Sequence, residues 1–373
     1  MKLNMICEGG YISNDNFSNV VLAAGGNSLI TLANAQASPL EGLLPIISSV
    51  GSRNLSMQVD GTKASESQAL QIINAILGAN TSVSVSSIAS MTAQAVESIV
   101  QAGVGKKLSI GIDCAVSSQD SVVHAIDSAV RSGISFSVGS LNALTTEGVS
   151  AVFQAAQGST FTASLDGRTT SGNKLQEVIS AANGSAASLS LFNSSYVPIS
   201  DLLNAFSLIG GRTLDMSFDA TLITAQNLKD LVSSAPASVG IGIDAAQGIV
   251  VSSLVEIIQA SGAKRLAVNL GADQATNDQM QSSVDSGGAT TSISIGSAHV
   301  PQLSIMLGMI ASSANTNLSP IYNGSQLIVT PTDGNWVVRA LEVAQPSTQI
   351  IVNSVGVTSF TLSIVLDILS AAG

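Results

Sequence analysis

The chain has 373 residues, and 45% of them are hydrophobic whereas only 10% are charged. With 13 lysines and arginines against 24 aspartates and glutamates, its net charge of −11 disfavours attraction to nucleic acid or to an anionic membrane surface. No apolar run reaches the roughly 18 residues that mark a membrane-spanning helix, so we expect neither a nucleic-acid partner nor a membrane span.

Short runs of alternating apolar and small residues recur from the N-terminus onward. Examples are Leu55–Val59, Leu108–Ile112 and Leu266–Leu270, and such period-two alternation indicates a strand. The first apolar residues of the runs fall at positions 3, 29, 55, 83, 108, 136, 161, 189, 214, 239, 266, 293, 318 and 350. The sequence therefore predicts about fourteen strands, mostly 25 to 28 residues apart.

A helical pattern separates consecutive strands. Val96, Ile99 and Val100 share one face of a helix, and glycines such as Gly133 and Gly184 stand where helices would end. Strands joined through a helix run parallel. We therefore predict an α/β solenoid of strand–helix repeats with a continuous parallel sheet inside and helices outside.

A longer period of 53 residues is superimposed on the single repeat. The strand starts Leu55, Leu108, Phe161 and Leu214 follow it, and so do Asp60, Asp113, Asp166 and Asp219. Basic residues keep the same step at Arg53, Lys106 and Arg212. The unit is thus a pair of repeats, and residues 1–373 are predicted to form one domain, with irregular repeats near 315–350 around Pro320 and Pro331.

The pattern resembles the leucine-rich-repeat family, in particular its ribonuclease-inhibitor-like branch of βα repeats. The Leu-x-Leu core is present in Leu108-Ser-Ile110 and Leu189-Ser-Leu191, whereas the upstream Leu and the Asn of the full Leu-x-x-Leu-x-Leu-x-x-Asn signature are largely missing. The resemblance implies the architecture of a curved solenoid and implies no particular ligand.

The number of repeats bears on whether the solenoid closes. Strands lie ~4.8 Å apart and packed helices ~9.5 Å apart, so two layers separated by ~10 Å close on themselves after about 13 units. Inward-facing strand residues such as Ser109, Gly111, Ser164, Gly240 and Gly242 are small, as tight curvature requires. Neither terminal repeat has the polar cap of an open solenoid. We therefore favour a closed toroid over an open horseshoe that dimerises through its ends.

Acidic residues follow several strands and give the first candidate site: Asp60, Asp113, Asp166, Asp219 and Asp244. They should lie at the C-terminal ends of parallel strands, where such sheets bind ligands. One interpretation is therefore a carboxylate rim for a small ligand or a cation. The other is local, because Asp after a strand forms an Asx turn or caps the next helix. Arg53, Lys106, Lys107, Arg212, Lys264 and Arg265 should lie at the opposite edge, near helix C-termini that favour cations.

No motif for catalysis, a metal or a cofactor is evident. His124 and His299 are the only histidines, and a nucleophile elbow, a P-loop and a zinc-protease motif are all missing. The segment Gly240–Gly248 superficially suggests a nucleotide loop, but its glycines alternate within a strand and should face the inside of the sheet. We therefore expect no catalytic residue, no metal site and no cofactor.

A second candidate site lies in the irregular repeats. Trp336 is the only tryptophan, and Tyr322 and Arg339 lie near it in the sequence. Irregular insertions in repeat proteins often form recognition surfaces, so these three residues are a candidate patch for a partner. Alternatively, Trp336 fills the seam where the last repeats meet the first.

These observations favour a non-enzymatic interaction or scaffold protein that binds a protein partner or itself, similar to repeat-containing bacterial effectors. The alternative is an enzyme, or a protein that binds a small ligand or a cation, acting at the acidic rim. Two buried free thiols, Cys7 and Cys114, and the lack of a signal peptide predict a cytoplasmic location. Secretion without a cleavable signal is the alternative location.

Overall fold

The computed structural model describes residues 2–298, 300–301, 303–323, 334–355 and 362–372. In this part of the chain, fourteen strands alternate with fourteen α-helices. The strands are β1 Lys2–Glu8, β2 Ser28–Ala33, β3 Asn54–Asp60, β4 Thr81–Ser86, β5 Lys107–Asp113, β6 Ser135–Gly139, β7 Thr160–Asp166, β8 Ala186–Phe192, β9 Leu214–Asp219, β10 Val239–Asp244, β11 Arg265–Gly271, β12 Thr291–Gly296, β13 Asn317–Asn323 and β14 Gln349–Val355. Each begins within three residues of a predicted strand start.

The helices fill the intervals between the strands. They are α1 Asn14–Ala23, α2 Leu40–Ser48, α3 Glu66–Asn74, α4 Ala93–Gly103, α5 Gln119–Ser132, α6 Thr146–Ala155, α7 Gly172–Ala181, α8 Ile199–Leu208, α9 Ala225–Ser234, α10 Val251–Ser261, α11 Asn277–Ser286, α12 Leu303–Ser312, α13 Gly334–Val343 and α14 Leu362–Ala372. None of the helices in the described residues is long and apolar enough to cross a membrane.

All the strand pairs described are parallel, and the strand order is cyclic, that of a closed barrel. The order closes at β1, which pairs with β2 on one side and with β14 on the other, with Leu3 opposite Ile350 and Met5 opposite Val352. The prediction of a closed βα-repeat sheet is therefore confirmed. The alternative of an open horseshoe does not agree with this pairing, because its first and last strands would be unpaired edges.

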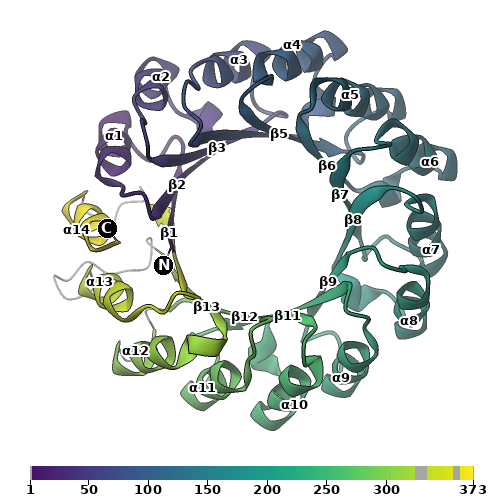
Figure 1. Cartoon of the computed structure of the whole chain (residues 1–373), viewed down its shortest axis with the longest axis vertical. Coiled ribbons are helices and arrows are strands. Elements are labelled where there is room, and N and C mark those ends of the chain that lie inside the picture. Colours follow the sequence, from purple (N-terminus) through teal and green to yellow (C-terminus); the bar gives the residue numbers. More distant parts are fainter. Residues whose placement is uncertain (1, 299, 302, 324–333, 356–361, 373) are drawn as a thin grey trace. The chain divides into compact units, whose positions relative to one another are not determined.

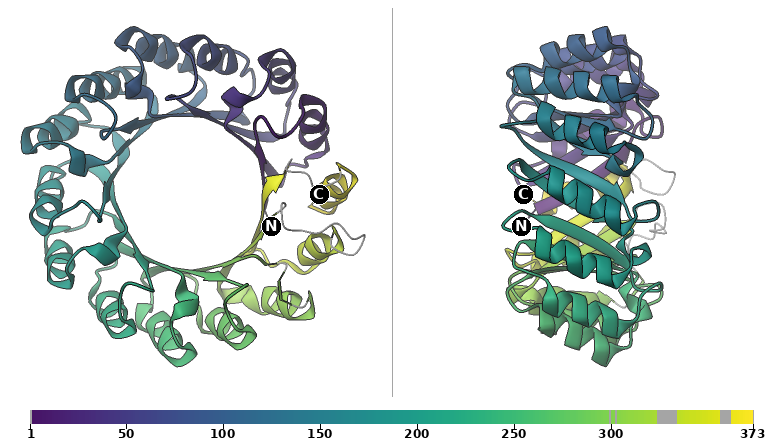
Figure 2. Two further views of the ribbon diagram at one scale, coloured as in Figure 1. Left: turned by 180° about the vertical axis from the view of Figure 1, so that it is seen from behind. Right: turned by 90° about the vertical axis from the view of Figure 1, so that its right-hand side faces the viewer.

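The chain divides into two compact units. Unit 1 contains Met1–Ser137, Ile321–Ala344 and Gln349–Gly373, and unit 2 contains Val138–Pro320 and Gln345–Thr348. Within each unit the strands form a curved parallel sheet and the helices lie side by side on its convex face (Figures 1 and 2). That residues 1–373 form a single domain stays a prediction.

Alternation along the strands produces this arrangement. In β5, Leu108, Ile110 and Ile112 are buried towards the helices, while Ser109 and Gly111 lie on the other face and are partly exposed. Most helices begin at a Ser or Thr whose hydroxyl accepts a hydrogen bond from the backbone N–H three residues on, the usual N-cap. These residues are Ser13, Ser65, Thr92, Ser118, Thr145, Ser171, Thr224 and Thr276.

The 53-residue step has a structural cause. After every second strand the chain passes through one residue in the left-handed region: Asn34, Ser87, Ser140, Asn193, Ala245 and Ser297. In the first five of these repeats a short 3₁₀ helix follows, as at Ala35–Ala37 and Ser194–Tyr196. The strands in between, from β3 to β9, end instead in an aspartate and a tight turn. Two kinds of strand exit therefore alternate.

The basic residues before the strands stabilise helix ends, as the sequence predicts. Lys106 Nζ donates to the carbonyl of Ile73 at 2.7 Å, Arg212 donates to that of Ile179 at 2.9 Å, and Lys264 Nζ donates to that of Val232 at 2.8 Å. Arg53 contacts the carbonyl of Leu22 in the same way at 3.0 Å. Each cation thus satisfies a carbonyl near the C-terminus of a helix, where the helix dipole is negative.

Candidate functional site

The aspartates at the strand ends have local partners. Oδ1 of Asp60, Asp113, Asp166 and Asp219 accepts a hydrogen bond of 2.9 to 3.0 Å from the backbone N–H two residues later, which is an Asx turn. Thr221 donates from its hydroxyl and its N–H to Asp219, and these bonds lower the pKa of that carboxyl below its usual 3.8. The geometry thus gives these carboxylates a structural role. A ligand-binding role for them stays a proposal.

The aspartates are not gathered into one cluster. Within the described residues, no group of three or more His, Cys, Asp and Glu side chains could hold a metal ion. Asp219 on β9 and Asp244 on β10 are register partners on neighbouring strands. Asn269 on β11 donates a 2.6 Å hydrogen bond to Asp244 Oδ1.

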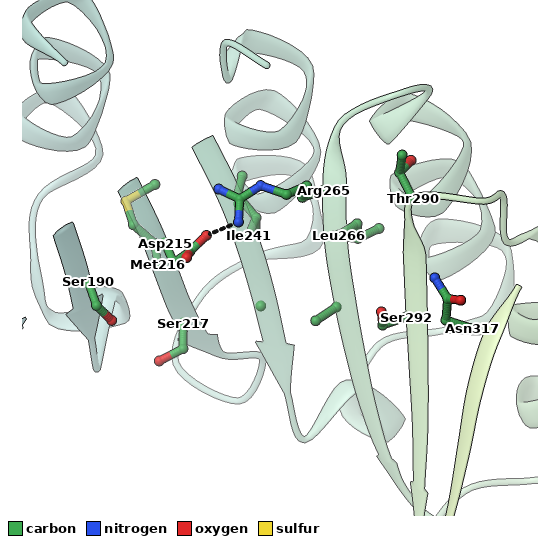
Figure 3. Close-up of a pocket in the computed structure, with 13 residues that line it drawn as sticks. Ser190, Asp215, Met216, Ser217, Ile241, Arg265, Leu266, Thr290, Ser292 and Asn317 are labelled. Atoms are coloured by element: carbon green, nitrogen blue, oxygen red, sulfur yellow. Dashed lines mark ion pairs between the residues drawn. The ribbon is translucent and has the colours of Figure 1, made fainter. Parts of the chain in front are cut away.

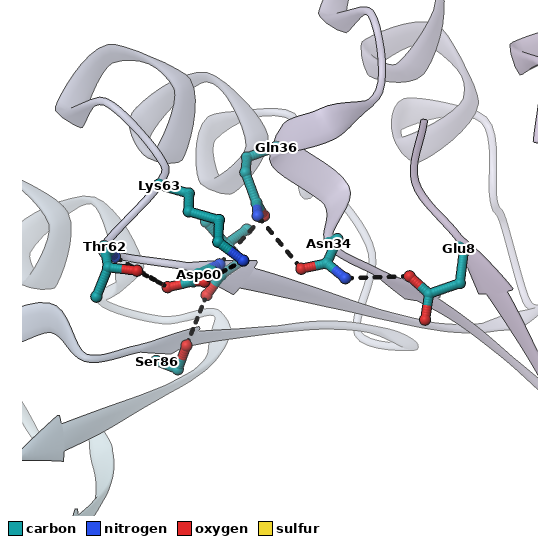
Figure 4. Close-up of polar contacts among 8 residues, drawn as sticks. Glu8, Asn34, Gln36, Asp60, Thr62, Lys63 and Ser86 are labelled. Atoms are coloured by element: carbon teal, nitrogen blue, oxygen red, sulfur yellow. Dashed lines mark hydrogen bonds and ion pairs between the residues drawn. The ribbon is translucent and has the colours of Figure 1, made fainter. Parts of the chain in front are cut away.

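At the strand ends of unit 1, Glu8 and Asp60 belong to a polar network (Figure 4). Gln36 accepts a hydrogen bond from the backbone N–H of Asp60 at 3.1 Å, Asn34 donates to Glu8 at 3.0 Å, and Lys63 pairs with Asp60 at 3.2 Å. A hollow of about 250 Å³ lies beside Asp60, between Gln58 and Ser84. Because the network satisfies its own polar groups, it holds the ends of the strands in register.

A larger hollow of about 510 Å³ lies on the concave face of unit 2, over β10 (Figure 3). Its lining is mostly small or polar: Ser190, Asp215, Met216, Ser217, Gly240, Ile241, Gly242, Arg265, Leu266, Ala267, Thr290, Ser292 and Asn317. Hydroxyl groups of Ser190 on β8, Ser217 on β9, and Thr290 and Ser292 at β12, together with the carboxamide of Asn317, give it hydrogen-bonding capacity. The volume is typical of a small-molecule site.

Gly240 and Gly242 form the floor of this hollow. Both face the concave side, as the sequence predicts, since Val239, Ile241 and Ile243 are buried towards the helices. Register places Gly240 between Asp215 and Arg265, and Gly242 between Ser217 and Ala267. Glycine at these two positions leaves the backbone of β10 without side chains on that face.

An ion pair crosses β10 at one end of the hollow. Arg265 Nη1 lies 2.8 Å from Asp215 Oδ1, and both side chains are about half exposed. Nη2 of the same guanidinium donates to the carbonyl of Ser238 at 3.1 Å. A Cβ on Gly240 would collide with Asp215 Oδ1 and come within 3.2 Å of Arg265 Cζ. Glycine at 240 is therefore what allows the ion pair to span the strand (Figure 3).

Gly242 has different surroundings. A Cβ at this position would meet Met216 O at 3.5 Å and Ser217 Cβ at 3.7 Å, which are ordinary van der Waals contacts. The fold would accept a side chain here, and its absence keeps the hollow open.

The residues of the predicted partner patch, Tyr322, Trp336 and Arg339, lie on β13 and α13. Tyr322 is fully buried, because its side chain points from β13 into the core, and burial raises the pKa of its hydroxyl. Trp336 lies in α13, but its side chain is outside the described residues. Arg339 is exposed on α13 and pairs with Glu342 at 3.2 Å. Of the three, only Arg339 is seen to offer a surface for a partner, so the patch stays a proposal.

The remaining titratable candidates have structural surroundings. His124 on α5 lies 3.6 Å from Glu97 on α4, whereas His299 is outside the described residues. Cys7 and Cys114 are free and buried, as predicted, and burial raises the pKa of both thiols to about 12. Both thiols therefore stay protonated and unreactive at neutral pH.

The comparisons with known proteins give no family. No family model matches the chain, and no curated protein matches it. The structure shows that the chain is built from βα repeats. Membership of the leucine-rich-repeat family stays a prediction.

Similar solved structures do exist. One is a chain of the yeast Rad7–Elc1 complex, with 11% identity over 91% of this chain and 88% of that one and a TM-score of 0.45. A dihydrodipicolinate synthase family protein from Coccidioides immitis has 10% identity over 83% and 81%, with a TM-score of 0.33. A chain of the tryptophan synthase complex from Pyrococcus furiosus has 13% identity over 70% and 92%, with a TM-score of 0.27.

Enzymes predominate among these solved structures, which also include an aldolase named QR15. This finding contradicts the expectation of a non-enzymatic interaction or scaffold protein, and with it the expectation that the chain is not an enzyme. No activity or substrate is carried over from these proteins to this chain.

Proposed function

We propose that this protein binds a small polar molecule, as ligand or substrate, in the hollow over β10. The observation that carries the proposal is Gly242. Glycine inside a strand costs roughly 0.5 to 1 kcal/mol relative to alanine, yet the neighbours of Gly242 leave room for a Cβ. Packing therefore does not require this glycine, whereas an open hollow does.

The lining indicates the chemistry of the bound molecule. Ser190, Ser217 and Ser292 offer hydroxyls that both donate and accept hydrogen bonds, and Asn317 adds a carboxamide. Asp215 and Arg265 are the charged members of the lining. A molecule with several hydroxyl, carbonyl or charged groups would satisfy these partners, whereas an apolar one would leave them without hydrogen bonds.

The proposed site in the hollow lies next to part of the acidic rim. Asp219 and Asp244 lie beyond Ser217 and Gly242 on the same face of the sheet, at the C-terminal ends of β9 and β10. A ligand longer than the hollow would extend towards these two carboxylates. The rim would then contribute as one end of the site rather than as a cation site of its own.

A ligand-observed NMR screen of a metabolite library tests the proposal. The wild-type protein should give hits that Gly242→Val loses, because the valine side chain fills the hollow. Ser188→Val is the matched control, since Ser188 lies on the same face of β8 but not in the lining. Its hits should match those of the wild type. Slow change of a bound metabolite's spectrum would identify a substrate.

Hits that survive Gly242→Val unchanged would overturn the proposal, as would a screen with no hits for the wild type. A folded state for each variant is checked first by its cooperative unfolding transition.

We also propose an evolutionary relationship to the leucine-rich-repeat family. The closed run of parallel strands and outer helices supports remote descent from leucine-rich-repeat proteins. Self-association or a protein partner would engage other surfaces, and Arg339 on α13 supports only a small part of such a surface.

A further inference from the structure

Arg265 is the first residue of β11 and directly follows another basic residue, Lys264. In its repeat Lys264 already donates to the carbonyls of Val232 and Ser233 at the end of α9, at 2.8 and 2.5 Å. Arg265 is therefore a second cation, which the helix end does not need. Its side chain crosses the concave face of β10 and ends at the edge of the hollow (Figure 3).

We infer that Arg265 binds an anionic group, a carboxylate or a phosphate, of the molecule that occupies the hollow. This inference rests on the proposed function and names the class of its ligand. A guanidinium presents five N–H donors in a planar fork that matches the oxygens of both groups. The contacts of Arg265 with Asp215 and Ser238 engage Nη1 and Nη2 and hold the fork in place.

The charges around the hollow support an anion rather than a second cation. Of the lining residues that the structure describes, Arg265 is the single positively charged one and Asp215 the single negatively charged one. Asp215 Oδ1 lies against Gly240 beneath the guanidinium, so its role is explained by the ion pair. The side chain of Arg265 is about half exposed, and its guanidinium has more N–H donors than these two contacts use.

In this arrangement Asp215 is a positioning residue that has two opposite effects on the binding of an anion. It fixes Arg265 before binding, which reduces the side-chain entropy lost in the complex. Its own negative charge also opposes an incoming anion. Removing that charge while keeping the shape should therefore strengthen anion binding, which a purely structural ion pair would not do.

The test uses titration calorimetry with succinate, its neutral analogue succinamide and inorganic phosphate as probes. The wild-type protein should bind succinate or phosphate at least about tenfold more tightly than succinamide. Arg265→Gln should remove this preference, and Asp215→Asn should increase the affinity for the anion about threefold or more. Lys107→Gln is the matched control, because Lys107 is the first residue of β5 and follows the basic residue Lys106, just as Arg265 is the first residue of β11 and follows Lys264. It should leave every affinity unchanged.

The outcomes separate this inference from the proposed function. If Gly242→Val abolishes binding but Arg265→Gln changes nothing, the hollow is a site and the role of Arg265 is refuted. If Arg265→Gln abolishes anion binding and Gly242→Val does not, the anion binds outside the hollow and both proposals fail. Equal affinity for succinate and succinamide refutes the inference alone. The inference is also refuted if neither anion binds measurably at concentrations up to about 20 mM, because a titration to that concentration would detect even a millimolar Kd.

Discussion

Gly240 and Gly242 are two residues apart on one strand and have different reasons to be glycine. The sequence predicts that both face the inside of the sheet, because they alternate with Val239, Ile241 and Ile243. It does not predict the ion pair above Gly240. Asp215 and Arg265 are 50 positions apart, and their meeting depends on the register of three strands.

This difference predicts opposite effects of two similar substitutions. Gly240→Ala should destabilise the protein by up to about 1 kcal/mol, because the new methyl group displaces Asp215 from a half-exposed ion pair. Gly242→Ala should stabilise it by about 0.4 to 1 kcal/mol, since alanine fits and loses less chain entropy on folding. Urea denaturation of both variants measures the difference. Equal effects of the two substitutions would show that the ion pair does not constrain position 240.

The Asx turn at Asp219 predicts a pH dependence. Its hydrogen bonds to Thr221 hold the carboxyl pKa below the usual 3.8 in the folded state. A lowered folded pKa contributes stability that is present above the unfolded value and is lost as the pH falls through the folded value. Thr221→Val removes the hydroxyl donor, so the variant should be less stable than the wild type above about pH 5 and the gap should close below about pH 3.

Unfolding free energies measured across this pH range test the prediction, with Thr162→Val as a control for the loss of a hydroxyl group. A gap between wild type and Thr221→Val that stays constant down to pH 2 would contradict it, because the carboxyl would then not be involved.

At the scale of elements, the sequence shows the 53-residue step but not its cause. The left-handed residues that end alternate strands are of different types, among them Asn34, Ser87 and Ala245. Only Asn is typical of that conformation, so residue type alone does not identify the position. The 3₁₀ helices that follow most of them are also too short to leave a periodic pattern.

Ala245 is the least favourable of these left-handed residues, with φ of 52°. Ala245→Asn should raise the free energy of unfolding by about 0.5 to 1 kcal/mol, because Asn tolerates this conformation better than Ala. Asn193→Ala is the reciprocal change in another repeat. It should lower stability by about 1 kcal/mol or more, because it also removes the 2.9 Å hydrogen bond to Asp166. Guanidinium denaturation measures the free energy of unfolding of both variants. A destabilised Ala245→Asn variant would contradict the left-handed conformation of residue 245.

At the scale of the whole molecule, closure of the sheet follows from simple geometry. The spacings of strands and helices predict closure at about 13 units, and the described residues contain fourteen strands in a cyclic order. The sequence does not predict the proposed site, because the residues that line the hollow come from separate repeats. No local sequence motif identifies these residues, whereas the irregular repeats predicted a partner patch around Trp336.

Closure predicts a specific cross-link. Asn4 on β1 and Ile351 on β14 are register partners on the concave face. The double variant Asn4→Cys, Ile351→Cys should form an intrachain disulfide under mild oxidation, seen as faster migration on a non-reducing gel. Asn4→Cys with Ser84→Cys, on β4, is the control that should stay reduced, because β2 and β3 separate the two strands. An unlinked first pair would mean that the chain ends do not meet.

The measurement that tests the account most directly is a crystal structure of the protein with its tightest-binding compound from the metabolite screen. The account predicts that the compound lies against Gly242, with an anionic group on the guanidinium of Arg265. A compound bound only elsewhere, for example in the hollow beside Asp60, would contradict it.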